Sequence, residues 1–451
     1  MIRDHRELPV TGATPDTLAR YETALAAFNC YHGDPVARVD EALTAAPQFV
    51  MAHALKAALY LSGTEQPAAE AAADFIAHAR TLPANDRERA LLDALDQIAH
   101  GEFTLAAERF DSLLADHPRD LLALQIAHLY DFNRGDTTRL RERPAAVLKR
   151  FSRDLPGHHA VLGMHAFGLE ESGDYNAALD QGHAALAANR KDAWAHHAVA
   201  HVFEMRGEID AGIAWMRDRE PDWSPDNLMA VHNWWHLTLY HLDRGDTSDA
   251  LRLYDTRVRP GDSKVVLELI DATAMLWRMH LRGIDVGDRW QPLADAWSAH
   301  EADDFYAFNT WHAALTQIAA GREDAAHRLV ARMEYLVRAG AGSNGTGGPR
   351  DTLRMAMNVT LPLLRGVTAF VRGEYSQAAE TLARARPGAR QFGGSHAQRD
   401  LITLTLMEAL RRAGSFAGLR ALAAERLAAK PHDRVGLVHA RAAYAAQPQV
   451  A

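Results

Sequence analysis

The chain has 451 residues, of which 48% are hydrophobic and 24% charged, so a globular protein with a large apolar core is expected. The net charge is −9 and charges of both signs are interspersed, which argues against the basic face of a nucleic-acid-binding protein. The single cysteine, Cys30, gives no disulfide framework, and neither a signal peptide nor a membrane-spanning apolar run is found, so we expect a cytoplasmic protein that does not bind membranes.

A glycine followed by a short polar step and an alanine-rich amphipathic run recurs along the chain. The clearest copies are GEFTLAAERF at 101, GDYNAALDQG at 173, GEIDAGIAWM at 207, GDTSDALRLY at 245, GREDAAHRLV at 321 and GEYSQAAETL at 373, and weaker copies begin at Gly33, Gly63, Gly135, Gly283 and Gly414. From Gly101 to Gly321 the spacings are 34, 38, 34, 38, 38 and 38 residues. A period of this length with helical patterns on both sides of the glycine indicates a helical repeat.

The repeat resembles the tetratricopeptide repeat, in which each unit is a helix–turn–helix. The glycine lies where one helix ends and the next begins, because it tolerates the left-handed conformation common at helix C-termini. No alternating run rich in valine and isoleucine predicts a strand. The predicted fold is therefore all-α, a right-handed superhelical solenoid of tetratricopeptide-like helix-turn-helix repeats.

One interruption divides the predicted array. We expect repeats over residues 1–338, a Gly-rich loop over 339–350 and a continuation of the same superhelix over 351–451, all in one domain. Gly340, Gly342 and Gly345 form a literal G-x-G-x-x-G, but the preceding HRLVARMEYLVRA has helical periodicity, whereas a dinucleotide fingerprint follows a strand. A loop over one end of the groove is the expected role.

Several first helices carry histidine, tryptophan and asparagine at matching distances from their glycine, on the helices that line the concave surface of such repeats. In DAWAHHAVAHVFEMRG, the residues Trp194, His197, His201 and Glu204 follow one another at spacings of three, four and three, which forms one helical stripe. In VHNWWH, Asn233 and His236 lie twelve and nine residues before Gly245. Asn309 and His312 stand at the same distances before Gly321, so we expect these groups to converge on one pocket.

Other first helices add polar groups, and tryptophans supply apolar walls. The candidate ligand-binding residues are His128, Asp131, His165, Glu170, Trp194, His197, His232, Asn233, Trp235, Asn309, His312, His396 and Arg399. If the pocket is catalytic, His201 or His236 is the expected general base, Glu204 its orienting partner, and Asn233 with Asn309 the hydrogen-bonding anchors.

The chain also resembles a family through several longer segments. These include DRERALLDALD (86–96), LPGHHAVLGMHAFGLEESGDY (155–175), KDAWAHHAVAHVFEMRGEIDAGIAWM (191–216), AVHNWWH (230–236) and GGSHAQRD (393–400). They look like the tetratricopeptide repeat protein 38 family, and the resemblance spans roughly residues 85 to 415. It implies an all-α repeat fold and adds little about chemistry.

Three functional classes remain open from the sequence. The favoured one is a His/Trp/Asn-rich internal pocket that binds a small polar molecule or a peptide end without a cofactor, and that could also perform acid–base chemistry on it. The second is a divalent metal site in which His197, His201 and Glu204 act as two histidines and one carboxylate, completed by His232 or His236. The third is a scaffold whose groove captures a peptide from a protein partner. No stripe is apolar enough to predict an oligomer.

Overall fold

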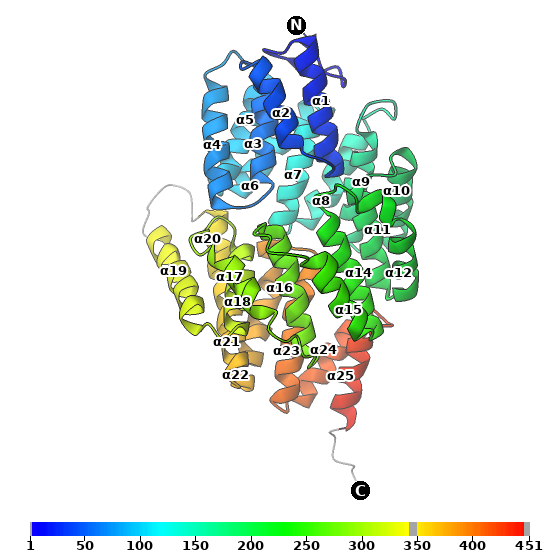
Figure 1. Cartoon of the computed structure of the whole chain (residues 1–451), viewed down its shortest axis with the longest axis vertical. Coiled ribbons are helices and arrows are strands. Elements are labelled where there is room, and N and C mark those ends of the chain that lie inside the picture. The colour runs from blue at the N-terminus through cyan, green and yellow to red at the C-terminus, as the bar shows by residue number, and fades with distance from the viewer. Residues whose placement is uncertain (1, 342–349, 446–451) are drawn as a thin grey trace. The chain divides into compact units, whose positions relative to one another are not determined.

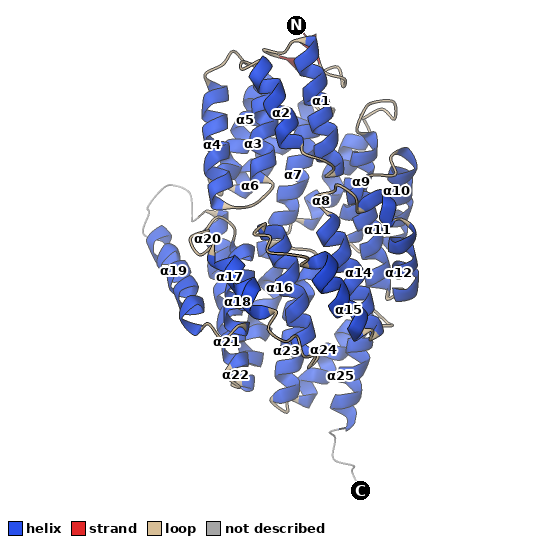
Figure 2. Ribbon diagram, in the orientation of Figure 1, coloured by secondary structure: helices blue, strands red, loops and turns tan. Residues whose placement is uncertain are grey.

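The computed structural model describes residues 2–341 and 350–445, and helices form almost all of the regular structure within them (Figure 2). The chain divides into two compact units. The first comprises Met1–Val199, Arg219–Ala230 and Arg350–Thr352, and the second comprises Ala200–Asp218, Val231–Pro349 and Leu353–Ala451.

The first unit is built mainly from consecutive antiparallel helix pairs, labelled in Figure 1. Its elements are β1 (Ile2–Arg3), β2 (Pro9–Val10), α1 (Pro15–Cys30), α2 (Pro35–Ala45), α3 (Val50–Leu61), α4 (Gln66–Arg80), α5 (Asp86–Ala99), α6 (Phe103–Asp116), α7 (Leu121–Asn133), α8 (Thr137–Leu148), α9 (His158–Glu170), α10 (Tyr175–Ala188), the first half of α11 (Ala193–Arg206) and α13 (Glu220–Trp223). Within it α1 packs on α2, α3 on α4, α5 on α6 and α9 on α10.

The second unit continues the same pattern with longer interruptions. It contains the second half of α11, α12 (Ile209–Asp218), α14 (Ala230–Arg244), α15 (Thr247–Leu253), the π-helical turn η1 (Tyr254–Val258), α16 (Val266–Leu281), α17 (Trp290–Ser298), α18 (Ala307–Ala319), α19 (Glu323–Ala341), α20 (Asp351–Met355), the π-helical turn η2 (Ala356–Thr360), α21 (Leu361–Val371), α22 (Tyr375–Ala385), the 3₁₀ helix η3 (Arg386–Phe392), α23 (His396–Arg412), α24 (Phe416–Ala429) and α25 (Arg434–Ala445). Here α16 packs against α18 and α23, and α21 packs against α22.

The repeat glycines lie between the paired helices, as predicted. Ten of the eleven have φ between 65° and 95°, the left-handed region that ends one helix and lets the next begin. The exception is Gly63, where the following residue, Thr64, takes the positive φ of 58° instead. The predicted positions of the turns between paired helices are therefore confirmed, and the turn between α3 and α4 is shifted by one residue.

A small residue five positions after the glycine packs the second helix of a pair closely onto its neighbours. This position is occupied by Ala106, Ala178, Gly212, Ala250, Ala326 and Ala378. The alanines at this position are buried, so the helices approach with no larger side chain between them. Both observations confirm an all-α fold of tetratricopeptide-like helix-turn-helix repeats.

The expectation that no strand occurs was wrong at the N-terminus, where β1 and β2 form a two-stranded antiparallel hairpin. Its turn is held by the side chain of Asp4, whose Oδ1 accepts hydrogen bonds from the backbone N–H groups of Arg6 and Leu8, each at 2.9 Å. The Arg6 guanidinium in turn reaches Glu22 of α1 at 2.8 Å. Such a hairpin depends on side-chain hydrogen bonds rather than on alternating apolar residues, so the pattern search did not find it.

The predicted Gly-rich loop over 339–350 lies largely outside the described residues, as do Gly342 and Gly345 of the G-x-G-x-x-G. The segment before them is helix α19 rather than a strand, as the periodicity predicted. No helix in the described ranges combines the length and the apolar character needed to cross a membrane.

Candidate functional site

The sixteen candidate residues divide between the two units. The first unit holds His128, Asp131, His165, Glu170, Trp194 and His197, and the second holds His201, Glu204, His232, Asn233, Trp235, His236, Asn309, His312, His396 and Arg399. All except His165, His232, His396 and Arg399 are buried.

In the first unit His128 lies among aromatic rings. Its ring centroid is 6.2 Å from that of Phe167 and 5.8 Å from that of Trp194, both edge-on. Neither ring nitrogen has a hydrogen-bond partner within the described residues. Burial, reinforced by Arg143 and His165, lowers the pKa of His128 from 6.5 to about 3, so the ring is neutral at physiological pH.

The acidic neighbour of His128 in sequence has a different role. Asp131 accepts two hydrogen bonds from Arg143, at 2.7 Å from Nε and 3.2 Å from Nη2, and both side chains are buried. This bidentate pair joins α7 to α8.

The other candidates of the first unit are packed or half-buried. Trp194 stacks on Tyr31, with ring centroids 5.8 Å apart, and His197 packs beside Trp194 and Phe167. His165 is half-buried on α9, and Glu170 ends that helix.

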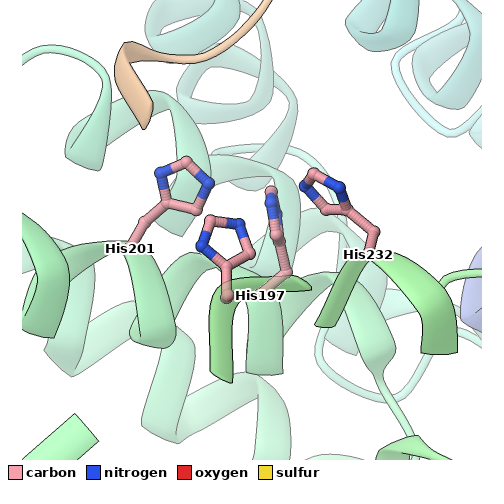
Figure 3. Close-up of side chains that lie close together, drawn as sticks. His197, His201 and His232 are labelled. Atoms are coloured by element: carbon pink, nitrogen blue, oxygen red, sulfur yellow. The ribbon is translucent and has the colours of Figure 1, made fainter. Parts of the chain in front are cut away.

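In the second unit three histidines form one group, which we call the histidine cluster: His201 of α11 with His232 and His236 of α14. His232 and His236 are four residues apart and therefore lie on the same face of α14. Each of the three offers a ring nitrogen, and these atoms lie within 4.8 Å of one another. The ring centroids of His201 and His236 are 4.4 Å apart, and those of His232 and His236 are 4.9 Å apart. Figure 3 shows the side chains of His201 and His232 close together.

Two buried carboxylates hold rings of the cluster. Nδ1 of His232 lies 2.9 and 3.0 Å from the oxygens of Asp271, on α16. Nδ1 of His236 lies 3.2 Å from Oε2 of Glu204, one turn after His201 on α11. A carboxylate accepts a hydrogen bond only from a protonated ring nitrogen, so in the neutral form of each ring the proton is on Nδ1 and the lone pair is on Nε2.

A buried cation and a tryptophan complete the surroundings of the cluster. The indole of Trp235 stacks on the His232 ring, with centroids 5.4 Å apart and planes 11° apart. The Arg278 guanidinium lies over the Trp235 ring, 5.2 Å from its centroid. Burial, together with His201, His232 and Arg278, holds the pKa of His236 well below 6.5. His236 is therefore neutral at pH 7.

Some polar groups beside the cluster have no hydrogen-bond partner within the described part of the chain. Asn233 is 0% exposed, and neither its amide nitrogen nor its amide oxygen has a hydrogen-bond partner among the described residues. The same holds for Nε1 of the fully buried Trp235. Buried polar groups are nearly always hydrogen-bonded, and an unmatched one costs about 1–3 kcal/mol, so these groups call for a polar partner from outside the chain.

The remaining candidates lie on α18 and α23. Asn309 and His312 are buried on α18, and Nδ1 of His312 donates to the carbonyl of Phe308 at 2.9 Å. Burial lowers the pKa of His312 to about 4, and Arg278 contributes to the shift. Arg278 thus acts electrostatically on both His236 and His312.

The GGSHAQRD segment has a structural explanation. Ser395 is the N-cap of α23 and forms a capping box with Gln398, while Gly393 and Gly394 both have positive φ. A Cβ on Gly394 would lie 2.8 Å from the Phe308 ring, so the turn packs directly on α18. His396 is the first residue of α23, and Arg399 donates to the carbonyl of Gly394.

Sequence reasoning missed two residues of this site, Asp271 and Arg278. Both lie in VLELIDATAMLWRMHL, where they are buried charges seven residues apart on a largely apolar helix. That pattern is a signal in its own right, because a buried charge requires a partner.

No family model matches the sequence. Among solved structures, the chain is similar to the Cut9–Hcn1 hetero-tetramer of the APC/C at 12% identity and a TM-score of 0.46, with 95% of this chain and 76% of that chain covered. It is also similar to the human IFIT1 dimer with PPP-AAAA at 13% identity and a TM-score of 0.39, with 84% and 88% covered. A monomeric IFIT1 mutant gives 12% identity, a TM-score of 0.42 and 96% coverage of both chains. At these values the likeness concerns the arrangement of helices alone.

Proposed function

We propose that this chain is a member of the tetratricopeptide repeat protein 38 family that binds a small polar ligand at the histidine cluster and acts on it by acid–base chemistry. The observation that carries the proposal is the Asn233 amide, which is fully buried beside the cluster and has no hydrogen-bond partner among the residues that the structure describes. A ligand with both hydrogen-bond donors and acceptors would satisfy it.

The acid–base part rests on His236. Its ring is neutral at pH 7, its Nδ1 proton is held by Glu204, and the lone pair on Nε2 can therefore accept a proton. The carboxylate stabilises the imidazolium that forms, as an orienting acid does for a catalytic histidine. Because the group is buried, each of these interactions is stronger than in water.

The test compares two buried asparagines that differ in their partners. Asn29 of α1 donates to Gln125 at 3.2 Å, whereas Asn233 has no partner in the described protein. We expect Asn29→Leu to lower the free energy of unfolding by about 1–3 kcal/mol, because it leaves Gln125 unmatched. We expect Asn233→Leu to leave the stability of the ligand-stripped protein unchanged or higher.

The ligand itself is measured by mass spectrometry of the small molecules released when the purified full chain is denatured. Wild type should release a polar organic molecule near one equivalent, and Asn233→Leu should release much less. If wild type releases none, or if Asn233→Leu destabilises the chain as much as Asn29→Leu does, the proposal is wrong and Asn233 has a structural role.

A further inference from the structure

We propose that His201, His232 and His236 bind one divalent transition-metal ion, of which zinc is the simplest choice. The inference rests on the ligand site of the proposed function but replaces the acid–base role of His236 there, because Nε2 of a metal-bound His236 cannot also accept a proton. It assigns the metal to three imidazoles and gives Glu204 a supporting position rather than a place among the ligands.

The donor atoms are close enough for one ion. Zinc binds imidazole nitrogen at about 2.0–2.1 Å, which places tetrahedral donors roughly 3.4 Å apart. One ring nitrogen from each histidine of the cluster lies within 4.8 Å of those from the other two, so small side-chain rotations would bring them to that spacing. Two of the ligands, His232 and His236, come from one helix face, which fixes their relative positions before any ion binds.

The hydrogen bonds around the rings are those of a metal site. Histidines that bind metals almost always donate their other ring N–H to a carboxylate or carbonyl, which fixes the tautomer and strengthens the donor nitrogen. Asp271 does this for His232 at 2.9 Å, and Glu204 does it for His236 at 3.2 Å. Two of the three ligands therefore have a buried carboxylate behind them, and both carry the lone pair on Nε2.

The charges also suit a divalent ion. The buried carboxylates of Asp271 and Glu204 contribute two negative charges beside the rings, and Arg278 contributes one positive charge. A divalent ion added to this set is opposed by a single cation and attracted by two anions. The two carboxylates therefore favour an ion of charge +2, and Arg278 opposes it.

The donor set limits the kind of ion and its use. Imidazole donors suit zinc, cobalt, nickel and copper rather than calcium or magnesium, which prefer oxygen. Three protein ligands leave one tetrahedral position open, as in metal sites where water or a substrate atom binds. The polar ligand would then occupy that position, with Asn233 as a hydrogen-bonding neighbour.

The experiment uses the full chain after removal of metals with a chelator, and Co²⁺ as a spectroscopic probe. We expect one Co²⁺ per chain with the intense visible absorption of tetrahedral coordination, and one equivalent of Zn²⁺ should displace it. His232→Gln should weaken binding strongly, because it removes a ligand that is partly exposed and thus tolerant of change. Asp271→Asn should weaken binding about 10- to 100-fold with the spectrum retained, the effect typical of a carboxylate behind a ligand.

The matched control is His241→Ala on the same helix. His241 is 6% exposed and groups with the half-buried Asp246 and Asp249, whose ligand atoms also approach one another, so its substitution reports metal binding outside the cluster. The inference stands if His241→Ala leaves Co²⁺ affinity unchanged while His232→Gln and Asp271→Asn lower it. It is overturned if wild type binds no stoichiometric Co²⁺, or if only His241→Ala reduces binding. Circular dichroism and the melting temperature of each metal-free variant confirm that the fold is retained.

The two proposals fail separately. A chain that binds no Co²⁺ but releases a polar organic molecule keeps the proposed function and loses the metal. A chain that binds Co²⁺ through the cluster but releases no organic molecule keeps the metal and loses the polar ligand as the proposed function describes it.

Discussion

At the scale of single residues, buried acids of this chain take two kinds of partner. Glu204 and Asp271 each face a histidine of the cluster, whereas Asp131 faces Arg143 in a bidentate ion pair. The first kind orients a ring that has a second nitrogen available for chemistry. The second kind neutralises a buried guanidinium and has a structural role.

This distinction predicts that Asp131→Asn destabilises the protein. The substitution leaves the buried Arg143 guanidinium without its main counter-charge, and breaking a buried pair in this way costs about 3 kcal/mol. Arg143 also contacts Asp111, whose side chain is 43% exposed, so Asp111→Asn is the matched control and should cost under about 1 kcal/mol. Urea unfolding of both variants measures the difference. Equal effects would show that burial does not decide the strength of these pairs.

Residue types were easier to predict than their partners. The stripe Trp194–Glu204 and the VHNWWH segment identify helices that carry the polar groups, because helical spacing is a local property. The sequence does not reveal that Asp271, 39 residues after His232, holds its ring. That pairing depends on how α14 and α16 pack, and a single sequence does not specify such long-range contacts.

At the scale of helices, close packing five residues after the repeat glycine positions the cluster. Gly212 takes this place in α12, the helix that follows α11. A Cβ there would lie 2.6 Å from Cζ of Tyr240. The hydroxyl of Tyr240 donates to the carbonyl of Ala200, one residue before His201. The glycine thus allows a contact that ties α14 to the part of α11 that carries His201.

We predict that Gly212→Ala disturbs both stability and the site. The added methyl group forces the Tyr240 ring to move, and overpacking of this kind costs about 1–3 kcal/mol. The movement should also weaken ligand or Co²⁺ binding, because α14 carries His232 and His236. Gly261→Ala is the control, since a Cβ there meets no atom within 4 Å and its φ is not positive. Thermal unfolding and Co²⁺ titration of the two variants are the measurements, and unaltered binding in Gly212→Ala would contradict the prediction.

The order of the helices was largely predictable because the glycine period repeats, and each copy supports the reading of the others. Structural features that occur only once were not predictable from the repeat. The hairpin β1–β2 depends on Asp4 and Arg6, and the π-helical turns η1 and η2 insert residues without any marker of periodicity. A repeat search averages over copies, so it finds what recurs and passes over local exceptions.

At the scale of the whole molecule, burying neutral histidines makes stability depend on pH. His128 titrates near 6.5 in the unfolded chain and at about 3 in the folded one. Between these values the unfolded state binds a proton that the folded state does not bind, so stability rises with pH. The loss on acidification begins below pH 6.5 and ends near pH 3.

We therefore predict that His128→Leu flattens the pH dependence of unfolding. At about 1.4 kcal/mol per pH unit, His128 alone costs about 2 kcal/mol between pH 6.5 and about pH 5. Leucine does not titrate and leaves no polar atom among Phe167 and Trp194, so the variant should lose that much less stability on acidification. Urea unfolding at about pH 7 and about pH 5 measures the change for the variant and the wild type. The exposed His327→Ala should keep the wild-type dependence, and a His128→Leu variant with the same dependence would show that another group controls the acid response.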